Sequence, residues 1–84
     1  MKGYYFSFRS VTPAQKALRI LTDAGIPASL GRAPAALAEN GCGYCLRVDD
    51  ARGPAAARAL RGTGVRSVWR RTASGWEEVR RDLL

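Results

Sequence analysis

The residues of this sequence best suited to chemistry are its two cysteines, Cys42 and Cys45, in the motif Cys-Gly-Tyr-Cys. A thiolate is a nucleophile and a metal ligand, and two thiols can exchange with a disulfide. The sequence contains no histidine, which removes the commonest general base and the commonest metal ligand. Sulfur chemistry is therefore the main candidate for a reaction at this site.

Several uses of the cysteine pair compete. A structural zinc site needs four protein ligands, so one chain cannot complete it, although a symmetric dimer could pool four thiolates. Thioredoxin-like exchange places the motif between a strand and a helix, whereas here it precedes a strand. A ferredoxin-like metallochaperone carries the pair where this chain has Arg9-Ser10-Val11, so that reading fails. A thiol–disulfide or metal-handling module stays an alternative, and so does a buried, unreactive cysteine.

The two thiols have different surroundings in the sequence. Cys42 lies in the loop Asn40-Gly41-Cys42-Gly43, where glycines allow a partner or ligand to approach the sulfur closely. Cys45 lies within a predicted strand, where burial as a small apolar side chain is equally compatible with its position. We therefore expect Cys42 to be the nucleophile.

Alternating and helical hydrophobic patterns predict the elements that must position this loop. We expect strands over 4–8, 28–30, 44–48 and 65–70, a turn of helix over 35–39, and helices over about 13–24 and from 49–50 to 62 or 64. Thr12 reads as the N-cap of the first long helix, with Pro13 next and Gln15 completing a capping box, and Gly25 ends that helix. A second capping box at 74–77 predicts a final helix with Trp76, Val79 and Leu83 on one side.

The order strand, helix, strand, strand, helix, strand predicts an α+β protein. We expect a ferredoxin-like βαββαβ plait, with an antiparallel four-stranded sheet in the order 4-1-3-2, two helices on one face and a short C-terminal helix. With only 84 residues and no internal repeat or linker, the chain (1–84) is expected to form a single domain.

This topology predicts where the cysteine loop lies. The third strand starts beside the end of the first strand, and hence beside Ser10 and the amides of Thr12 and Ala14 at the helix N-terminus. A helix N-terminus favours an anion such as a thiolate or persulfide. Arg9 and Arg47 could add positive charge. Gly43 would keep the loop open.

These residues also resemble a known family. Phe8-Arg9-Ser10, Ala14, Leu18, Leu21, Gly25-Ile26, Pro34 and Cys42-Gly43 followed by Leu46-Arg47 together look like the selenium/sulfur (Se/S) carrier protein-like family, formerly a bacterial domain of unknown function. The resemblance covers roughly residues 4–48. In the family pattern an arginine follows the loop proline, whereas Ala35 follows Pro34 here, and the second thiol, Cys45, is an addition.

The resemblance implies a small cytoplasmic bacterial carrier whose proposed carrier site is Cys-Gly, here Cys42 and Gly43. In this interpretation Cys42 accepts sulfane sulfur as a persulfide and Cys45 acts as a resolving thiol. Sulfur or selenium donor and acceptor proteins would be the partners, with no cofactor, no metal and no independent turnover.

Composition limits the remaining functions. The formal net charge is +7, but the basic residues are spread along the chain, and we expect no nucleic-acid partner from them. An interaction or RNA-binding module that uses the open sheet face, lined by Tyr5 and Arg47, stays an alternative. No apolar run is long enough to span a membrane, and the start Met1-Lys2-Gly3-Tyr4-Tyr5 does not resemble a signal peptide. We therefore expect a cytoplasmic protein.

Overall fold

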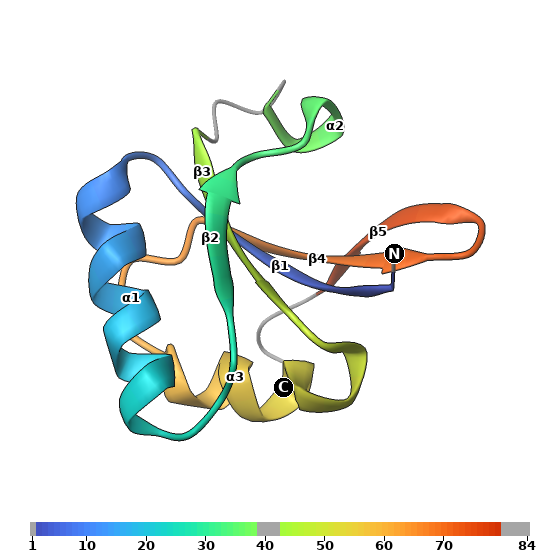
Figure 1. Cartoon of the computed structure of the whole chain (residues 1–84). Coiled ribbons are helices and arrows are strands. Elements are labelled where there is room, and N and C mark those ends of the chain that lie inside the picture. The colour runs from blue at the N-terminus through green and yellow to red at the C-terminus, as the bar shows by residue number, and fades with distance from the viewer. Residues whose placement is uncertain (1, 39–42, 80–84) are drawn as a thin grey trace.

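Strand β1 (Gly3–Phe8) lies at the centre of an antiparallel sheet in the computed structural model, which describes residues 2–38 and 43–79 (Figure 1). The remaining elements follow in the order α1 (Val11–Asp23), β2 (Ser29–Arg32), α2 (Ala35–Ala38), β3 (Tyr44–Val48), a 3₁₀ turn (Asp50–Arg52), α3 (Gly53–Ala59), β4 (Ser67–Thr72) and β5 (Gly75–Val79). The protein therefore belongs to the α+β class, as the sequence predicts.

The sheet has five strands in the order β2-β3-β1-β4-β5. The first four stand in the order expected from the sequence, and β5 is an additional strand beside β4. Every neighbouring pair is antiparallel, with β1 paired to β3 from Tyr4↔Val48 to Phe8↔Tyr44. Because of this register, the end of β1 lies beside the start of β3.

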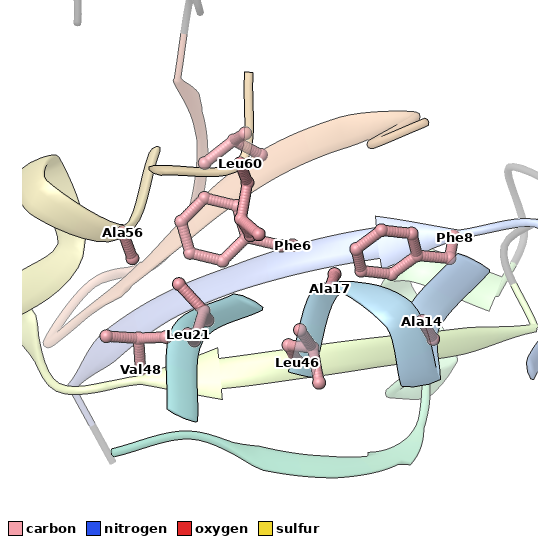
Figure 2. Packing of buried hydrophobic residues seen from close by; sticks show 10 residues of the cluster. Phe6, Phe8, Ala14, Ala17, Leu21, Leu46, Val48, Ala56 and Leu60 are labelled. Carbon is pink, nitrogen blue, oxygen red and sulfur yellow. The ribbon is translucent and has the colours of Figure 1, made fainter. Parts of the chain in front are cut away.

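The hydrophobic core lies between the sheet and the two longer helices. Phe6 and Phe8 on β1 point toward Ala14, Ala17 and Leu21 on α1 (Figure 2). Both phenylalanines are fully buried, as is Leu21. The other members of this buried cluster are Leu46, Val48, Ala56, Leu60 and Val68, and Leu18 packs against it with part of its surface exposed. The small alanines let α1 approach the strands closely, so the rings of both phenylalanines are shielded from water.

Helix α1 begins earlier than the sequence suggests. Ser10, with φ −143° and ψ 172°, is the N-cap, so Thr12 already lies in the first turn and the Thr12–Gln15 capping box is wrong. Proline is tolerated at this place because the first amides of a helix have no partner inside it. The predicted end is confirmed, since Ala24 is the C-cap and Gly25 has φ +76°.

The weaker elements differ from their predicted bounds by a few residues. Strands β2 and β4 end two residues later than expected, at Arg32 and Thr72. The helix expected from Asp49-Asp50 starts as a 3₁₀ turn and becomes α-helical at Gly53, where the ring of Tyr4 leaves no room for a Cβ. It ends at Ala59, before the glycines that the sequence suggested as its stop.

The predicted final helix is wrong, because the described part of its segment is strand β5. Gly75 has φ +133°, which a helix does not allow, and Thr72 Oγ1 closes the turn by donating to the Gly75 carbonyl over 3.2 Å. Trp76 and Val79 pair with Arg71 and Val68 on β4. The apparent capping box is a hairpin turn, and Leu83 lies outside the described residues.

An ion pair fastens the 3₁₀ turn to β4. Arg70 donates from Nε to Asp50 Oδ1 over 2.9 Å and from Nη2 to Asp50 Oδ2 over 3.0 Å. The hydrogen bond from Arg70 lowers the pKa of Asp50, and the charge of Arg70 acts in the same direction. This bidentate contact holds the connection between β3 and α3 against the sheet.

Leu21→Ala should lower the free energy of unfolding by about 2–5 kcal/mol, because it leaves a cavity in the buried cluster near Phe6. Urea denaturation followed by circular dichroism measures this loss. Val11→Ala removes an aliphatic side chain that is 36% exposed on the same helix, and should change stability by no more than about 0.5 kcal/mol. Equal effects of the two substitutions would mean that α1 does not complete the core.

Acid should destabilise the wild type more steeply than Asp50→Asn. The pKa of Asp50 is lowered by folding, so its ionised form favours the folded state above about pH 4, and this contribution disappears as the pH falls through the lowered value. Thermal unfolding between pH 6 and pH 2.5 measures the difference in Tm. Asp49→Asn, at an exposed neighbour, is the control and should follow the wild type. Parallel curves for all three proteins would contradict the role of the ion pair.

Candidate functional site

Gly43, directly after Cys42 in the chain, is held between two strands at one end of the sheet. Its amide donates to the Phe8 carbonyl over 3.2 Å, and its carbonyl accepts from the amide of Ala33 over 3.3 Å. The residue is nevertheless exposed. The backbone at this position is therefore fixed on both sides while its surface remains open to a partner.

The backbone of Gly43 lies close to that of Arg9. A Cβ at Gly43 would lie 3.3 Å from the carbonyl oxygen of Arg9, which is tighter than ordinary van der Waals contact. Arg9 is exposed and Ser10, the next residue, is the N-cap of α1. The sequence-derived neighbourhood of Gly43, Arg9 and Ser10 is thus present in the structure, whereas Cys42 lies outside the described residues.

The N-terminus of α1 keeps its positive partial charge. The first turn of the helix holds no acidic residue, and the side chain of Ser10 makes no capping hydrogen bond among the described residues. Acidic side chains and capping oxygens are the usual groups that offset the charge of a helix N-terminus. Their absence from this turn leaves the end of α1 suited to a neighbouring negative charge.

Cys45 has a different environment. Cys45 is 4% exposed, and its Sγ lies 3.8 Å from the carbonyl oxygen of Arg32 on β2. Cys45 alternates along β3 with Leu46, a core residue beneath α1, so it points to the opposite face of the sheet. The residue opposite Cys45 on β1 is Ser7, which is fully buried. The structure therefore agrees with the interpretation of Cys45 as a small buried side chain.

Arg47 is not brought to the helix N-terminus. It is half-buried on the same face as Cys45, where it pairs with Tyr5 on β1 and Ser29 on β2. It lies four positions beyond Gly43 along the chain, a distance of about 13 Å at the usual rise of a strand. The predicted site residues thus form two groups, with Gly43, Arg9 and Ser10 at the end of the sheet and Cys45 and Arg47 on the face away from α1 and α3.

That face also carries aromatic rings that contact one another. The ring centroids of Tyr5 and Trp76 are 4.8 Å apart in an edge-to-face arrangement, and the guanidinium of Arg71 lies 4.9 Å from the centroid of Trp76. Trp69 Nε1 donates to Ser67 Oγ over 3.0 Å. Because these rings have partners within the sheet, their arrangement gives the RNA-binding alternative no specific support.

Two arginines at the same end of the sheet as Gly43 were not identified as site residues from the sequence. Arg32 ends β2 opposite Tyr44, with its guanidinium 6.0 Å from that ring, and Arg66 precedes β4 and donates its amide to the Ser7 carbonyl over 2.8 Å. The order and direction of the strands would have placed both arginines at this end of the sheet. In such a sheet the end of β2 and the start of β4 lie at the same end as the start of β3.

A family model described as "Putative Se/S carrier protein-like" matches residues 3–67. The chain belongs to this family. The match includes the whole of the sheet end around Gly43 and stops at the first residue of β4, so β5 lies beyond it. Searches of curated proteins and of solved structures found no match. Among the described residues, no helix has the length and apolar character needed to cross a membrane.

We expect Cys42 to react with iodoacetamide at least about ten times faster than Cys45 in the folded protein, because burial restricts access to the Cys45 thiol. Peptide mass spectrometry across a pH series measures both rates. Cys42→Ser and Cys45→Ser isolate each thiol, and labelling in urea shows the rates without the fold. Faster labelling of Cys45, or a Cys42 that reacts only in urea, would contradict the assignment of the nucleophile.

Proposed function

We propose that this protein is a small carrier of sulfane sulfur or selenium, with Cys42 as the acceptor. The observation that supports the proposal most is the approach of Gly43 to within 3.3 Å, measured from an ideal Cβ, of the Arg9 carbonyl at the start of α1. Gly43, the residue that follows Cys42 in the chain, thereby lies beside a helix N-terminus whose first turn lacks acidic residues. Membership of the Se/S carrier-like family supports the same chemistry.

In the loading step, the Cys42 thiolate attacks the outer sulfur of a donor persulfide, R–S–SH. A bond forms between Cys42 Sγ and that sulfur, the S–S bond of the donor breaks, and the donor leaves as the thiolate R–S⁻. The hydrogen stays on the transferred sulfur. No external oxidant or reductant is required, because the transfer only exchanges one S–S bond for another. A second thiolate reverses the step and receives the sulfur.

Cys45 would act as a resolving thiol by attacking Sγ of the Cys42 persulfide. This step forms a Cys42–Cys45 disulfide and releases hydrosulfide, HS⁻. The burial of Cys45, which is 4% exposed, limits this reaction because little of its surface is open to a persulfide. We therefore assign resolution to a slow side reaction, and transfer to an acceptor as the main route.

The proposal also covers the fold of the carrier and its location in the cell. We infer a ferredoxin-like plait for β1-α1-β2-β3-α3-β4, with β5 added at its edge, and a cytoplasmic protein that cycles between donor and acceptor proteins. It would carry one sulfur for each loaded chain and have no turnover of its own. Arg9 and Ser10 would favour the anionic persulfide, while Arg47 stabilises the sheet from its other face.

Incubation with a persulfide donor should add 32 Da to the peptide that contains Cys42, which is the mass of one sulfur atom. Intact and peptide mass spectrometry of protein purified without reductant measures the addition. Cys45→Ser should retain it and Cys42→Ser should lose it. A loss of 2 Da without any addition would instead indicate the thiol–disulfide alternative, and addition on Cys45 alone would contradict the carrier site.

A further inference from the structure

Three exposed arginines lie at the end of the sheet where Gly43 is held. Arg9 follows β1, Arg32 ends β2 and Arg66 precedes β4. These three strand ends lie at the same end of the sheet, in the order β2, β3, β1, β4, because β3 pairs with both β1 and β2 and β1 also pairs with β4 (Figure 1). We call Arg9, Arg32 and Arg66 the arginine end of the sheet.

The acidic residues lie elsewhere. Asp23 ends α1, which starts at the arginine end and therefore finishes away from it, and Asp49 and Asp50 follow the far end of β3. Glu77 and Glu78 pair with Arg70 and Trp69 in the middle of β4. The part of the chain that the structure describes thus places no acidic residue at the arginine end, and Glu39 and Asp82 lie outside that part.

This separation of charge has a consequence for the loading step. A thiolate that attacks an anionic donor meets like-charge repulsion, which positive groups nearby offset. A unit positive charge about 7 Å from an anion in water accelerates the encounter about two- to three-fold at low ionic strength. Exposed charges lose this effect when salt shortens the Debye length to a few ångströms.

We propose that the arginine end is the docking surface for a small anionic sulfur donor, namely the persulfide of a carboxylate-bearing thiol such as glutathione. The inference rests on the proposed function of Cys42 and adds its substrate class. Carboxylates of the donor would contact the guanidinium groups of Arg9, Arg32 and Arg66, which provide paired N–H donors in a planar fork. The donor's outer sulfur is transferred to Cys42, and the thiolate of the donor departs with its carboxylates.

A pair of alkylating agents tests the charge effect without any persulfide. Iodoacetate and iodoacetamide attack the same thiolate and differ by one negative charge, so the ratio of their rates at Cys42 reports the local field. In a Cys45→Ser background, R9Q/R32Q/R66Q should lower this ratio about five- to ten-fold at low ionic strength. The effect should disappear in 0.5 M salt, where screening is nearly complete over such distances.

The control variant, K2Q/R19Q/R52Q, removes three exposed positive charges located away from the arginine end. It has the same net charge as the test variant and should change the ratio less than two-fold. Equal changes in the two variants would show a general effect of net charge and overturn the proposal. An equal fall in both alkylation rates would also overturn it, because the arginines would then act on the thiol and not on the reagent.

Glutathione persulfide and the persulfide of glutathione diethyl ester test the donor itself. The two donors have the same reacting sulfurs and differ by two carboxylates. The first should add 32 Da to Cys42 several-fold faster than the second, and R9Q/R32Q/R66Q should remove this preference. Equal loading by both donors would overturn the donor class while leaving the carrier function intact. Absence of loading with either donor would instead overturn the carrier function.

Discussion

The antiparallel pairing of β1 with β3 is the interaction on which the rest of the structure depends. It places Phe6 opposite Leu46, so that the apolar faces of both strands meet α1 and exclude water. The same register places Phe8 opposite Tyr44 and lets the Gly43 amide donate to the Phe8 carbonyl. The core and the candidate site are therefore consequences of one set of backbone hydrogen bonds.

The sequence predicts the parts of the fold whose patterns are both regular and buried. β1, α1 and β3 alternate or repeat as their burial requires, and β3 has the bounds expected from its residues, 44–48. The last predicted helix fails because Ser-Gly-Trp-Glu fits a capping box and a hairpin turn equally well in the local sequence. The conformation of Gly75 and the pairing of Trp76 with Arg71 decide between the two, and neither can be derived from local propensity.

The candidate site shows the same division. Predicting that Gly43, Arg9 and Ser10 are neighbours requires only the strand order, which the sequence supplies. The separation of Arg47 from this group follows from the length of strand between Gly43 and Arg47, about 13 Å at the usual rise per residue. Arg32 lies beyond the predicted end of β2 at residue 30 and Arg66 lies inside the predicted β4, so the predicted bounds did not place these two arginines at strand ends.

Strand β5 changes what the molecule presents at the boundary of its sheet. Without it, the outer backbone groups of β4, a strand that includes Trp69, would be unpaired and could hydrogen-bond to a strand of another chain. With it, the boundary moves to a short strand that carries Glu77 and Glu78, and the opposite boundary is the four-residue β2. Short and charged edges resist strand addition, so the hairpin protects a small, aromatic-rich sheet against self-association.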